Sequence, residues 1–216
     1  MTIQAVSVAD AVAVELRQRL LSGQYRGGEQ LRDTELSAEF GVARPTVRAA
    51  VQMLIADRLL ERGRGRSAAV RSFAVEDAVD LYRLRRPIEA TAVALVIAEH
   101  RELAGVEAIL DAFERLPGTS SWDLVADHDI AFHRAVLVAA GSPRLLRTFD
   151  DVGAELRLMI AQLRPAYASV ADLAAEHTTL LAALRGGDID RAQAAWTRHF
   201  DDAEQFFLSL IQEPTA

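Results

Sequence analysis

Residues 41–71, which read GVARPTVRAAVQMLIADRLLERGRGRSAAVR, constrain the fold of this chain more than any other stretch. Apolar residues recur there at helical spacing, which predicts an amphipathic helix from about Arg44 to Asp57. Two short strands are expected behind it, at residues 59–62 and 68–71, on either side of an arginine-rich tip. A helix followed by such a ribbon is typical of a winged helix-turn-helix.

The residues before this stretch supply the other helices of that motif. Apolar side chains recur every four positions over residues 6–21 and predict a first helix, which the glycines after it end. A short second helix is expected at residues 34–40, with Asp33 or Thr34 capping its start. Gly41 makes the turn into the third helix.

The third helix carries two arginines on its polar side. Its apolar face is expected to consist of Val47, Ala50, Val51 and Leu54. Arg44 and Arg48 are one turn apart, lie opposite that face, and occupy the part of a recognition helix that reaches base edges. Pro45 suits the first turn, and Thr46 can add a contact. Each arginine alone could belong to a solvated face, but the order of the elements favours DNA binding.

The charge of the chain is divided unevenly. Residues 1–72 hold 11 Arg against 8 Asp and Glu (net +3), whereas residues 73–216 hold 13 Arg against 23 Asp and Glu (net −10). This asymmetry indicates a basic binding unit joined to an acidic body. The chain has no cysteine, which excludes disulfides and thiolate metal sites. It also has neither a signal peptide nor an apolar run of ~20 residues, so we expect a cytoplasmic protein.

After residue 75 the pattern is helical to the end of the chain. Six helices are expected, at residues 75–99, 101–115, 119–140, 143–164, 170–185 and 188–211. Short breaks containing Gly or Pro separate them, so neighbouring helices should run antiparallel in a bundle. The predicted fold is therefore mainly α. It has an N-terminal winged helix-turn-helix domain over residues 1–72 and an antiparallel all-α six-helix bundle over residues 75–216.

Four polar residues of the body have positions that bear on metal binding. Asp129 and His133 are one helical turn apart and can bind one ion together. His177 and His199 lie on two later helices among apolar neighbours, and a buried imidazole needs a hydrogen bond or a metal. Spacing alone leaves both interpretations open. It favours hydrogen-bonded core histidines, because a carboxylate four residues from a histidine is common in an acidic chain.

The N-terminal unit resembles the GntR family of bacterial transcription regulators. The resemblance is carried by LRDTEL at residues 31–36, by GVARPTVR at residues 41–48, and by Leu54 and Leu59. It implies that the third helix contacts the operator. The residues expected on the DNA side are Arg32, Thr34, Arg44, Pro45, Thr46, Arg48, Arg64 and Arg66, the last two at the wing tip. The chain departs from the family pattern at Ala43, Ala49 and Ser67.

The acidic body resembles the FadR C-terminal ligand-binding domain (FCD), in its smaller, six-helix VanR-like branch. The matching features are Arg85 with Glu89, DHDIAFH at residues 127–133, GSPRL at residues 141–145, and two histidines near the C-terminus. In metal-binding members of the family, an Asp and three His from three helices hold a divalent ion. The corresponding residues here are Asp129, His133, His177 and His199. The resemblance therefore implies a bound Zn²⁺, Ni²⁺ or Mn²⁺.

The resemblance also implies that the effector is a small organic acid. Three imidazoles and one carboxylate would give the site a net charge of about +1 and leave two open positions on an octahedral ion. A carboxylate could fill both. Arg85 and Arg157 are candidates for a second contact with the acid; the alternative is that they form surface salt bridges, such as Arg85 with Glu89.

The expected protein is a homodimeric bacterial transcription regulator, a repressor, that binds a pseudo-palindromic operator and responds to the acid. An alternative is that the metal itself is the signal. A metal-dependent enzyme is disfavoured, because only His128 lies beside the ligand motif as a general base and a DNA-binding unit has no role in such an enzyme.

Overall fold

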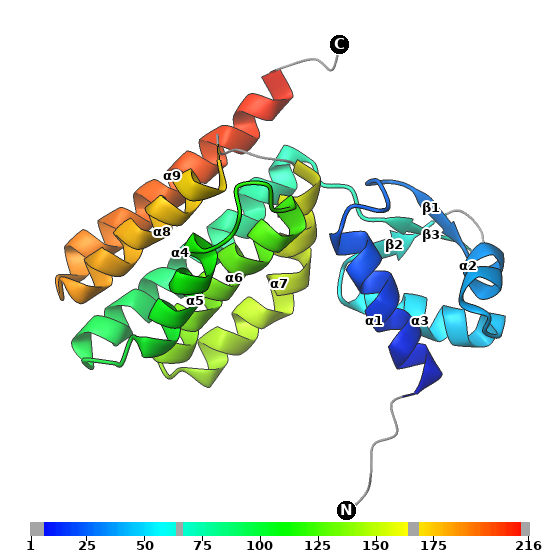
Figure 1. Cartoon of the computed structure of the whole chain (residues 1–216), viewed down its shortest axis with the longest axis horizontal. Helices are drawn as coiled ribbons and strands as arrows, with labels where there is room; N and C mark the ends of the chain where they lie inside the picture. Colours follow the sequence, from blue (N-terminus) through cyan, green and yellow to red (C-terminus); the bar gives the residue numbers. More distant parts are fainter. Residues whose placement is uncertain (1–6, 64–66, 164–168, 213–216) are drawn as a thin grey trace, which may run out of the picture. The chain divides into compact units, whose positions relative to one another are not determined.

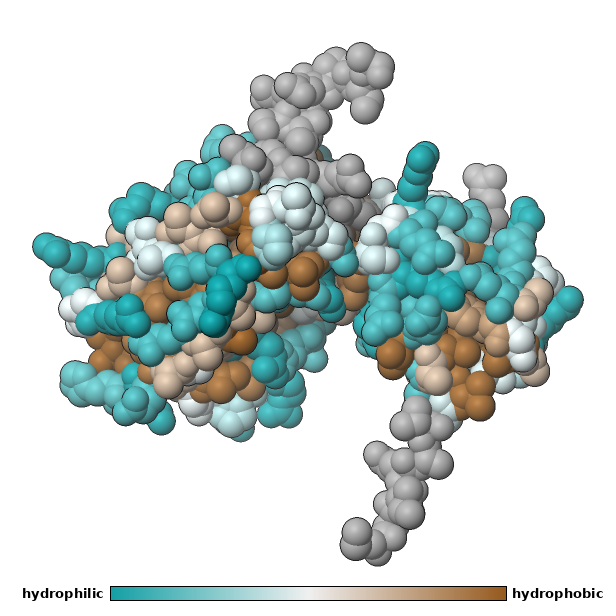
Figure 2. Space-filling model, in the orientation of Figure 1, coloured by the Kyte–Doolittle hydropathy of each residue, from teal (hydrophilic) through white to brown (hydrophobic). Residues whose placement is uncertain are grey.

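The computed structural model describes residues 7–63, 67–163 and 169–212, and its internal contacts divide the chain into two units, Met1–Phe73 and Ala74–Ala216 (Figure 1). The fold is mainly α, as predicted. Among the described helices, none is both long and apolar enough to cross a membrane. On the face drawn in Figure 2, hydrophilic residues cover most of each unit, with smaller hydrophobic patches between them.

Three helices form most of the described part of the first unit: α1 (Val8–Leu21), α2 (Asp33–Phe40) and α3 (Arg44–Ala56). Ser7 and Asp10 form a capping box at the start of α1, in which each side chain accepts a hydrogen bond from the other's backbone N–H. Helix α2 ends at Gly41, whose φ of 63° is left-handed and opens the turn into α3. The predicted apolar face of α3 is confirmed: Val47, Ala50, Val51 and Leu54 are all buried.

The start of α2 differs from the prediction. Neither Asp33 nor Thr34 caps the helix; Arg32 occupies the N-cap position in an extended conformation, without a side-chain cap. The prediction is wrong because Arg32 ends a strand that runs directly into the helix, so Asp33 is already its first helical residue. The Asp33 carboxylate is then free to face α3, where its Oδ2 lies 3.6 Å from Nε of Arg48.

The first unit also contains, among its described residues, a three-stranded antiparallel sheet. It consists of β1 (Gln30–Arg32), β2 (Leu60–Arg62) and β3 (Ser67–Val70), in the order β1-β3-β2. Leu31 of β1 pairs with Ala68 of β3, and Glu61 of β2 pairs with Ala69 of β3. The two wing strands were predicted and β1 was not. Strand β1 has only three residues and depends on pairing with a strand more than thirty positions later in the sequence.

Six helices make up the described part of the second unit: α4 (Val75–Ala98), α5 (Ala104–Glu114), α6 (Trp122–Ala139), α7 (Pro143–Leu163), α8 (Val170–Arg185) and α9 (Ile189–Gln212). Helix α4 packs against α6, α7 and α9, while α8 packs against α5 and α9. Figure 1 shows α8 and α9 side by side. Helix α4 is thus central in the bundle and is buried along much of its length.

An apolar cluster ties α5, α6 and α8 together. It contains Phe113, Val125, Val170, Leu173 and Ala174, all buried. Burying side chains of this size stabilises each by roughly 1.5–3 kcal/mol relative to exposure, with less for alanine. The cluster fixes α8 against α6, which are the two helices that carry most of the polar residues described next.

Candidate functional site

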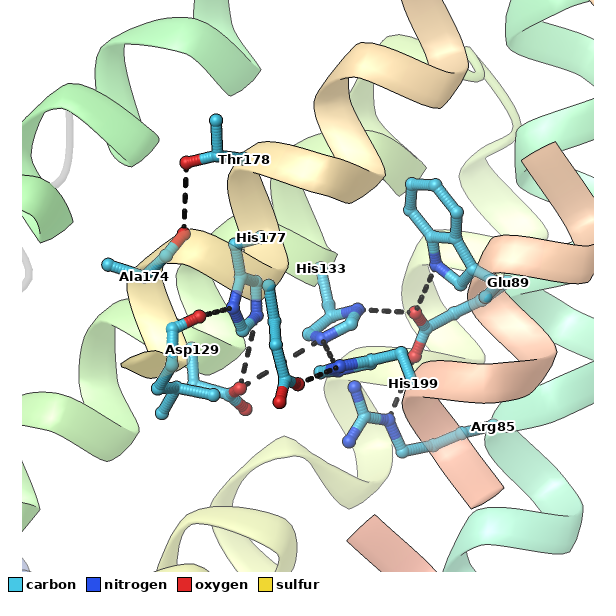
Figure 3. Close-up of polar contacts among 11 residues, drawn as sticks. Arg85, Glu89, Asp129, His133, Ala174, His177, Thr178 and His199 are labelled. Atoms are coloured by element: carbon cyan, nitrogen blue, oxygen red, sulfur yellow. Dashed lines mark hydrogen bonds and ion pairs between the residues drawn. The ribbon is translucent and has the colours of Figure 1, made fainter. Parts of the chain in front are cut away.

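Four polar side chains meet inside the helical unit, and we call them the Asp/His cluster (Figure 3). Asp129 and His133 come from α6, His177 from α8 and His199 from α9. One ligand atom of each lies within 4.8 Å of those of the other three. His133 and His177 have no exposed surface, and Asp129 and His199 are 7% exposed. The structure therefore brings the four residues of the predicted ligand set together.

The ring nitrogens and the carboxylate approach each other closely. Nε2 of His177 lies 3.2 Å from Oδ1 of Asp129, and Nε2 of His133 lies 4.0 Å from the same oxygen. Nε2 of His133 lies 3.2 Å from Nε2 of His199. Asp129 and His133 share the inner face of α6 because they are one turn apart. All three imidazoles thus present Nε2, rather than Nδ1, to one small volume.

The other nitrogen of each imidazole, Nδ1, donates a hydrogen bond outside that volume. The three bonds run from His133 to Oε2 of Glu89 at 2.6 Å, from His177 to the carbonyl oxygen of Leu173 at 2.8 Å, and from His199 to Oε2 of Glu176 at 3.1 Å. Carbonyl and carboxylate oxygens only accept, so Nδ1 carries the proton and Nε2 carries a lone pair. Histidines that bind metals usually have this arrangement.

The lone pairs that meet in the cluster lack a donor. His133 and His199 each direct an Nε2 lone pair at the other. Among the described residues, no hydrogen bond satisfies Nε2 of His177, which faces the Asp129 carboxylate. Buried acceptors without donors are unfavourable. A divalent cation bound by all four ligand atoms would satisfy each of them, so the donor set fits a metal ion.

The protonation states of the cluster also suit a metal ion. Burial lowers the pKa of His133 to about 4, more than the nearby Glu89 carboxylate raises it. Burial would raise the pKa of Glu89, but the charge of Arg85 and the contact with His133 lower it to about 2. Burial also opposes ionisation of Asp129, yet His177 and His133 hold the pKa of this carboxyl below its usual range. At neutral pH, His133 is therefore neutral beside ionised carboxylates.

Glu89 accepts hydrogen bonds from three different side chains. Its Oε1 accepts from Nε of Arg85 at 2.8 Å, and its Oε2 accepts from Nδ1 of His133 and from Nε1 of Trp196 at 3.2 Å. Figure 3 shows Glu89 on the far side of His133 from Asp129. From the sequence, Glu89 was considered only as a motif residue and as a salt-bridge partner of Arg85; its hydrogen bond with His133 was not predicted. In the sequence, Tyr82, Val93 and Val96 lie at helical spacing from Glu89, and this pattern could have placed Glu89 on the inner face of α4.

Arg85 pairs with Glu89, as the salt-bridge alternative anticipated, but the pair is not on the surface. Arg85 is 1% exposed and Glu89 has no exposed surface. The guanidinium carbon lies 5.0–5.7 Å from the ring centroids of Tyr82, Phe149 and Phe200. One of its terminal nitrogens, Nη2, is buried without a hydrogen-bond partner among the described residues. Arg85 is therefore linked to the Asp/His cluster through Glu89, and its Nη2 can still donate a hydrogen bond to a ligand.

Arg157 has a different neighbour. It lies on α7, with about a third of its side chain exposed, and forms an ion pair with Asp127 of α6. Asp127 is two residues from Asp129, so the two carboxylates project from different faces of the helix. The structure thus connects Arg85 to the cluster through Glu89 and pairs Arg157 with Asp127.

Six of the residues expected to contact DNA lie on α2 or α3 or directly before α2. Arg32, Thr34, Arg44, Pro45 and Arg48 are exposed, and Thr46 is half-buried. Arg32 pairs with Glu35 at 3.1 Å, and Arg48 pairs with Asp33. The start of α3 has Pro45 in its first turn and Ala43, which provides no side-chain cap. Arg64 and Arg66 lie outside the described residues.

The sequence matches two families of known proteins. Residues 80–202 match the FCD domain, and residues 8–70 match the family described as bacterial regulatory proteins, gntR family.

Individual relatives match nearly the whole chain. A protein of Paenarthrobacter nicotinovorans, named as a probable D-xylose utilization operon transcriptional repressor, is 28% identical over 199 residues, which cover 92% of this chain and 86% of the relative. The HTH-type transcriptional repressor GlaR of Escherichia coli is 28% identical over 202 residues, covering 85% and 88% of the two chains. The crystal structure of a GntR transcriptional regulator from Rhodococcus sp. RHA1 superposes with a TM-score of 0.83 at 29% identity, covering 93% and 97%.

Proposed function

Because the chain belongs to the GntR family of bacterial regulatory proteins and carries an FCD domain, we propose that it is a homodimeric transcriptional repressor controlled by a small organic acid bound beside a divalent metal ion. The DNA-binding domain spans residues 1–72, and the domain for effector binding and dimerisation spans residues 75–216. The six helices in the described part of the second unit support assignment to the VanR-like branch of the FadR subfamily.

The observation that carries the proposal is the convergence of three Nε2 lone pairs and one carboxylate in the Asp/His cluster. Asp129, His133, His177 and His199 would hold the ion, and Zn²⁺, Ni²⁺ and Mn²⁺ all accept such ligands. Once bound, the ion supplies a positive centre with open positions for a carboxylate. Arg85 supports the same ligand class, because its buried Nη2 can donate to a second oxygen of an acid.

Binding to DNA would use the exposed face of α3. Arg44 and Arg48 are one turn apart there, and both are exposed. Arginine at such positions reads guanine through paired hydrogen bonds, while Thr34, Thr46 and Arg32 suit the phosphate backbone. A two-fold dimer would place two such helices on the two halves of a pseudo-palindromic site.

Metal analysis combined with a thermal-shift screen of small carboxylic acids tests the proposed effector class. An acid that stabilises the metal-loaded protein, and that loses this effect after chelation, is the expected result. An acid that stabilises the metal-free protein as much as the metal-loaded protein would contradict an effector site beside the metal.

The alternative in which the metal itself is the signal is supported by the burial of all four ligand residues. A closed site can respond to the ion alone. Titration of Zn²⁺, Ni²⁺ or Mn²⁺ into the chelated protein, without any organic acid, separates the two: a change in operator affinity favours the ion as signal, and an unchanged affinity favours the acid.

A further inference from the structure

The Glu89 carboxylate accepts three hydrogen bonds beside the Asp/His cluster. Its two oxygens accept from three helices: from Arg85 of α4, from His133 of α6 and from Trp196 of α9. Both members of the Glu89–His133 pair have no exposed surface, so water does not compete for the bond. The carboxylate is therefore held in one orientation, and His133 is held against it.

This arrangement determines which nitrogen of His133 faces the other ligands. Oε2 of Glu89 is an acceptor only, and its 2.6 Å bond to Nδ1 keeps the proton on that nitrogen. Nε2 then bears the lone pair and points at the ligand atoms of Asp129 and His199. If the proton moved to Nε2, His133 could no longer act as a ligand there.

From this geometry we infer that Glu89 is a positioning residue of the metal centre: it fixes the tautomer and ring orientation of His133 and thereby sets the affinity for the divalent ion. The inference rests on the proposed metal function and extends it to a residue outside the ligand set. The role of Arg85 follows from it, because the guanidinium neutralises the buried carboxylate without taking the oxygen that His133 uses.

Glu89→Gln is the sharpest variant. Glutamine has nearly the same shape, but its amide nitrogen is a donor, and both ends of the Glu89 carboxylate face donors. Either the amide nitrogen opposes Arg85 and leaves His133 only a neutral carbonyl oxygen in place of the carboxylate, or it opposes Trp196 and drives the His133 proton to Nε2, so the charged acceptor of His133 is lost in both orientations. Loss of an outer-shell partner of this kind weakens metal binding about 10–100-fold.

Glu107→Gln is a matched control. Glu107 lies on α5 in the same unit, pairs with Arg185 at 2.7 Å and is partly exposed, so the substitution removes the same charge at a distance from the cluster's hydrogen bonds. Its metal affinity should equal that of the wild type.

The experiment is calorimetric titration of Zn²⁺ into full-length protein from which metal has been removed with a chelator. The stability of each metal-free variant is measured alongside. The expected result is a Kd about 10–100-fold higher for Glu89→Gln and unchanged for Glu107→Gln. Equal Kd values for Glu89→Gln and the wild type, with only the chelated stability lowered, would overturn the inference and leave Glu89 a structural residue.

A measurement on the wild type covers the case in which Glu89→Gln does not fold. Nitrogen-15 NMR of the Zn²⁺-loaded protein reports which ring nitrogen of His133 is protonated. Protonated Nδ1 with zinc on Nε2 is expected, and zinc on Nδ1 would overturn the inference. A wild type that binds none of Zn²⁺, Ni²⁺ and Mn²⁺ would instead contradict the proposed metal centre, and the role of Glu89 with it.

Discussion

The Nε2 atoms of His133 and His199 face each other across 3.2 Å, although Nδ1 of each ring already donates to a carboxylate oxygen. Two lone pairs at this distance repel unless a cation or a proton lies between them. His177 adds a third buried Nε2 without a hydrogen-bond donor among the described residues. The proposed sensor follows from this relationship, because one divalent cation removes all of these conflicts.

The first prediction concerns the ligand set. His177→Gln removes a buried ligand atom, and we expect the variant to retain no stoichiometric metal after dialysis, whereas the wild type retains one ion per chain. Elemental analysis of the two proteins checks this. His128→Gln is the control, because His128 is next to Asp129 in the sequence but bonds through Nδ1 to the carbonyl oxygen of Leu124 at 2.9 Å. Metal retained by His177→Gln would exclude His177 as a ligand.

The second prediction concerns stability. An ion that binds only the folded state stabilises it by about 2.7 kcal/mol when its free concentration is 100 times Kd. Chelation should therefore lower the melting temperature of the helical unit in the wild type and leave that of His177→Gln unchanged. Differential scanning calorimetry measures both. An equal fall in the two proteins would mean that the chelator acts elsewhere.

The third prediction concerns Asp33, which lies 3.6 Å from Nε of Arg48 and leaves the two terminal nitrogens of that guanidinium for a base. In Asp33→Asn the Arg48 side chain is no longer held by a carboxylate. The free energy of specific operator binding should therefore weaken by up to about 1–3 kcal/mol, the contribution of one bidentate base contact. Fluorescence anisotropy with specific and random duplexes measures the loss.

Glu35→Gln is the control for Asp33. Glu35 is also in the first turn of α2 but pairs with Arg32. Removing a negative charge near DNA should by itself raise affinity for any duplex. If Asp33→Asn raises affinity as Glu35→Gln does, Asp33 only repels phosphate and does not orient Arg48.

Helical periodicity was enough to predict the main features of the fold. The apolar face of α3 and the helices of the second unit follow from spacing within each segment. Strand β1 could not be predicted in this way, because three residues are too few to establish an alternating pattern and their partner strand is distant in sequence. The same limit explains why the N-cap residue of α2 was predicted wrongly, since Asp33 is the first helical residue only because β1 ends at Arg32.

The surroundings of the Asp/His cluster were likewise predictable only in part. The resemblance to a known family named Asp129, His133, His177 and His199, and the structure places them together. Spacing also indicated that Arg85 pairs with Glu89, but an interval of four residues does not reveal that the pair is buried. The bonds from His133 and Trp196 to Glu89 join three helices, so no local pattern could predict them.

The fourth prediction concerns Ala43, the N-cap residue of α3, which provides no side-chain hydrogen bond. Ala43→Ser should supply that bond and raise the free energy of unfolding of the DNA-binding unit by about 0.5–2 kcal/mol. Urea denaturation measures the change. Ala49→Ser is the control, because residue 49 is exposed within the same helix, where serine is slightly less favourable than alanine. Equal effects of the two substitutions would show that no cap had formed.

The most direct test of the central claim is the affinity of metal-loaded, full-length protein for its operator, with and without a saturating carboxylic acid chosen by the thermal-shift screen. The operator is selected from random duplexes by the same protein, and anisotropy gives Kd. If acid binding and DNA binding are coupled, the acid should change the operator Kd by about 5–150-fold. This change should disappear when the metal is removed with a chelator and in the His177→Gln variant. Identical operator affinity with and without the acid would contradict the account.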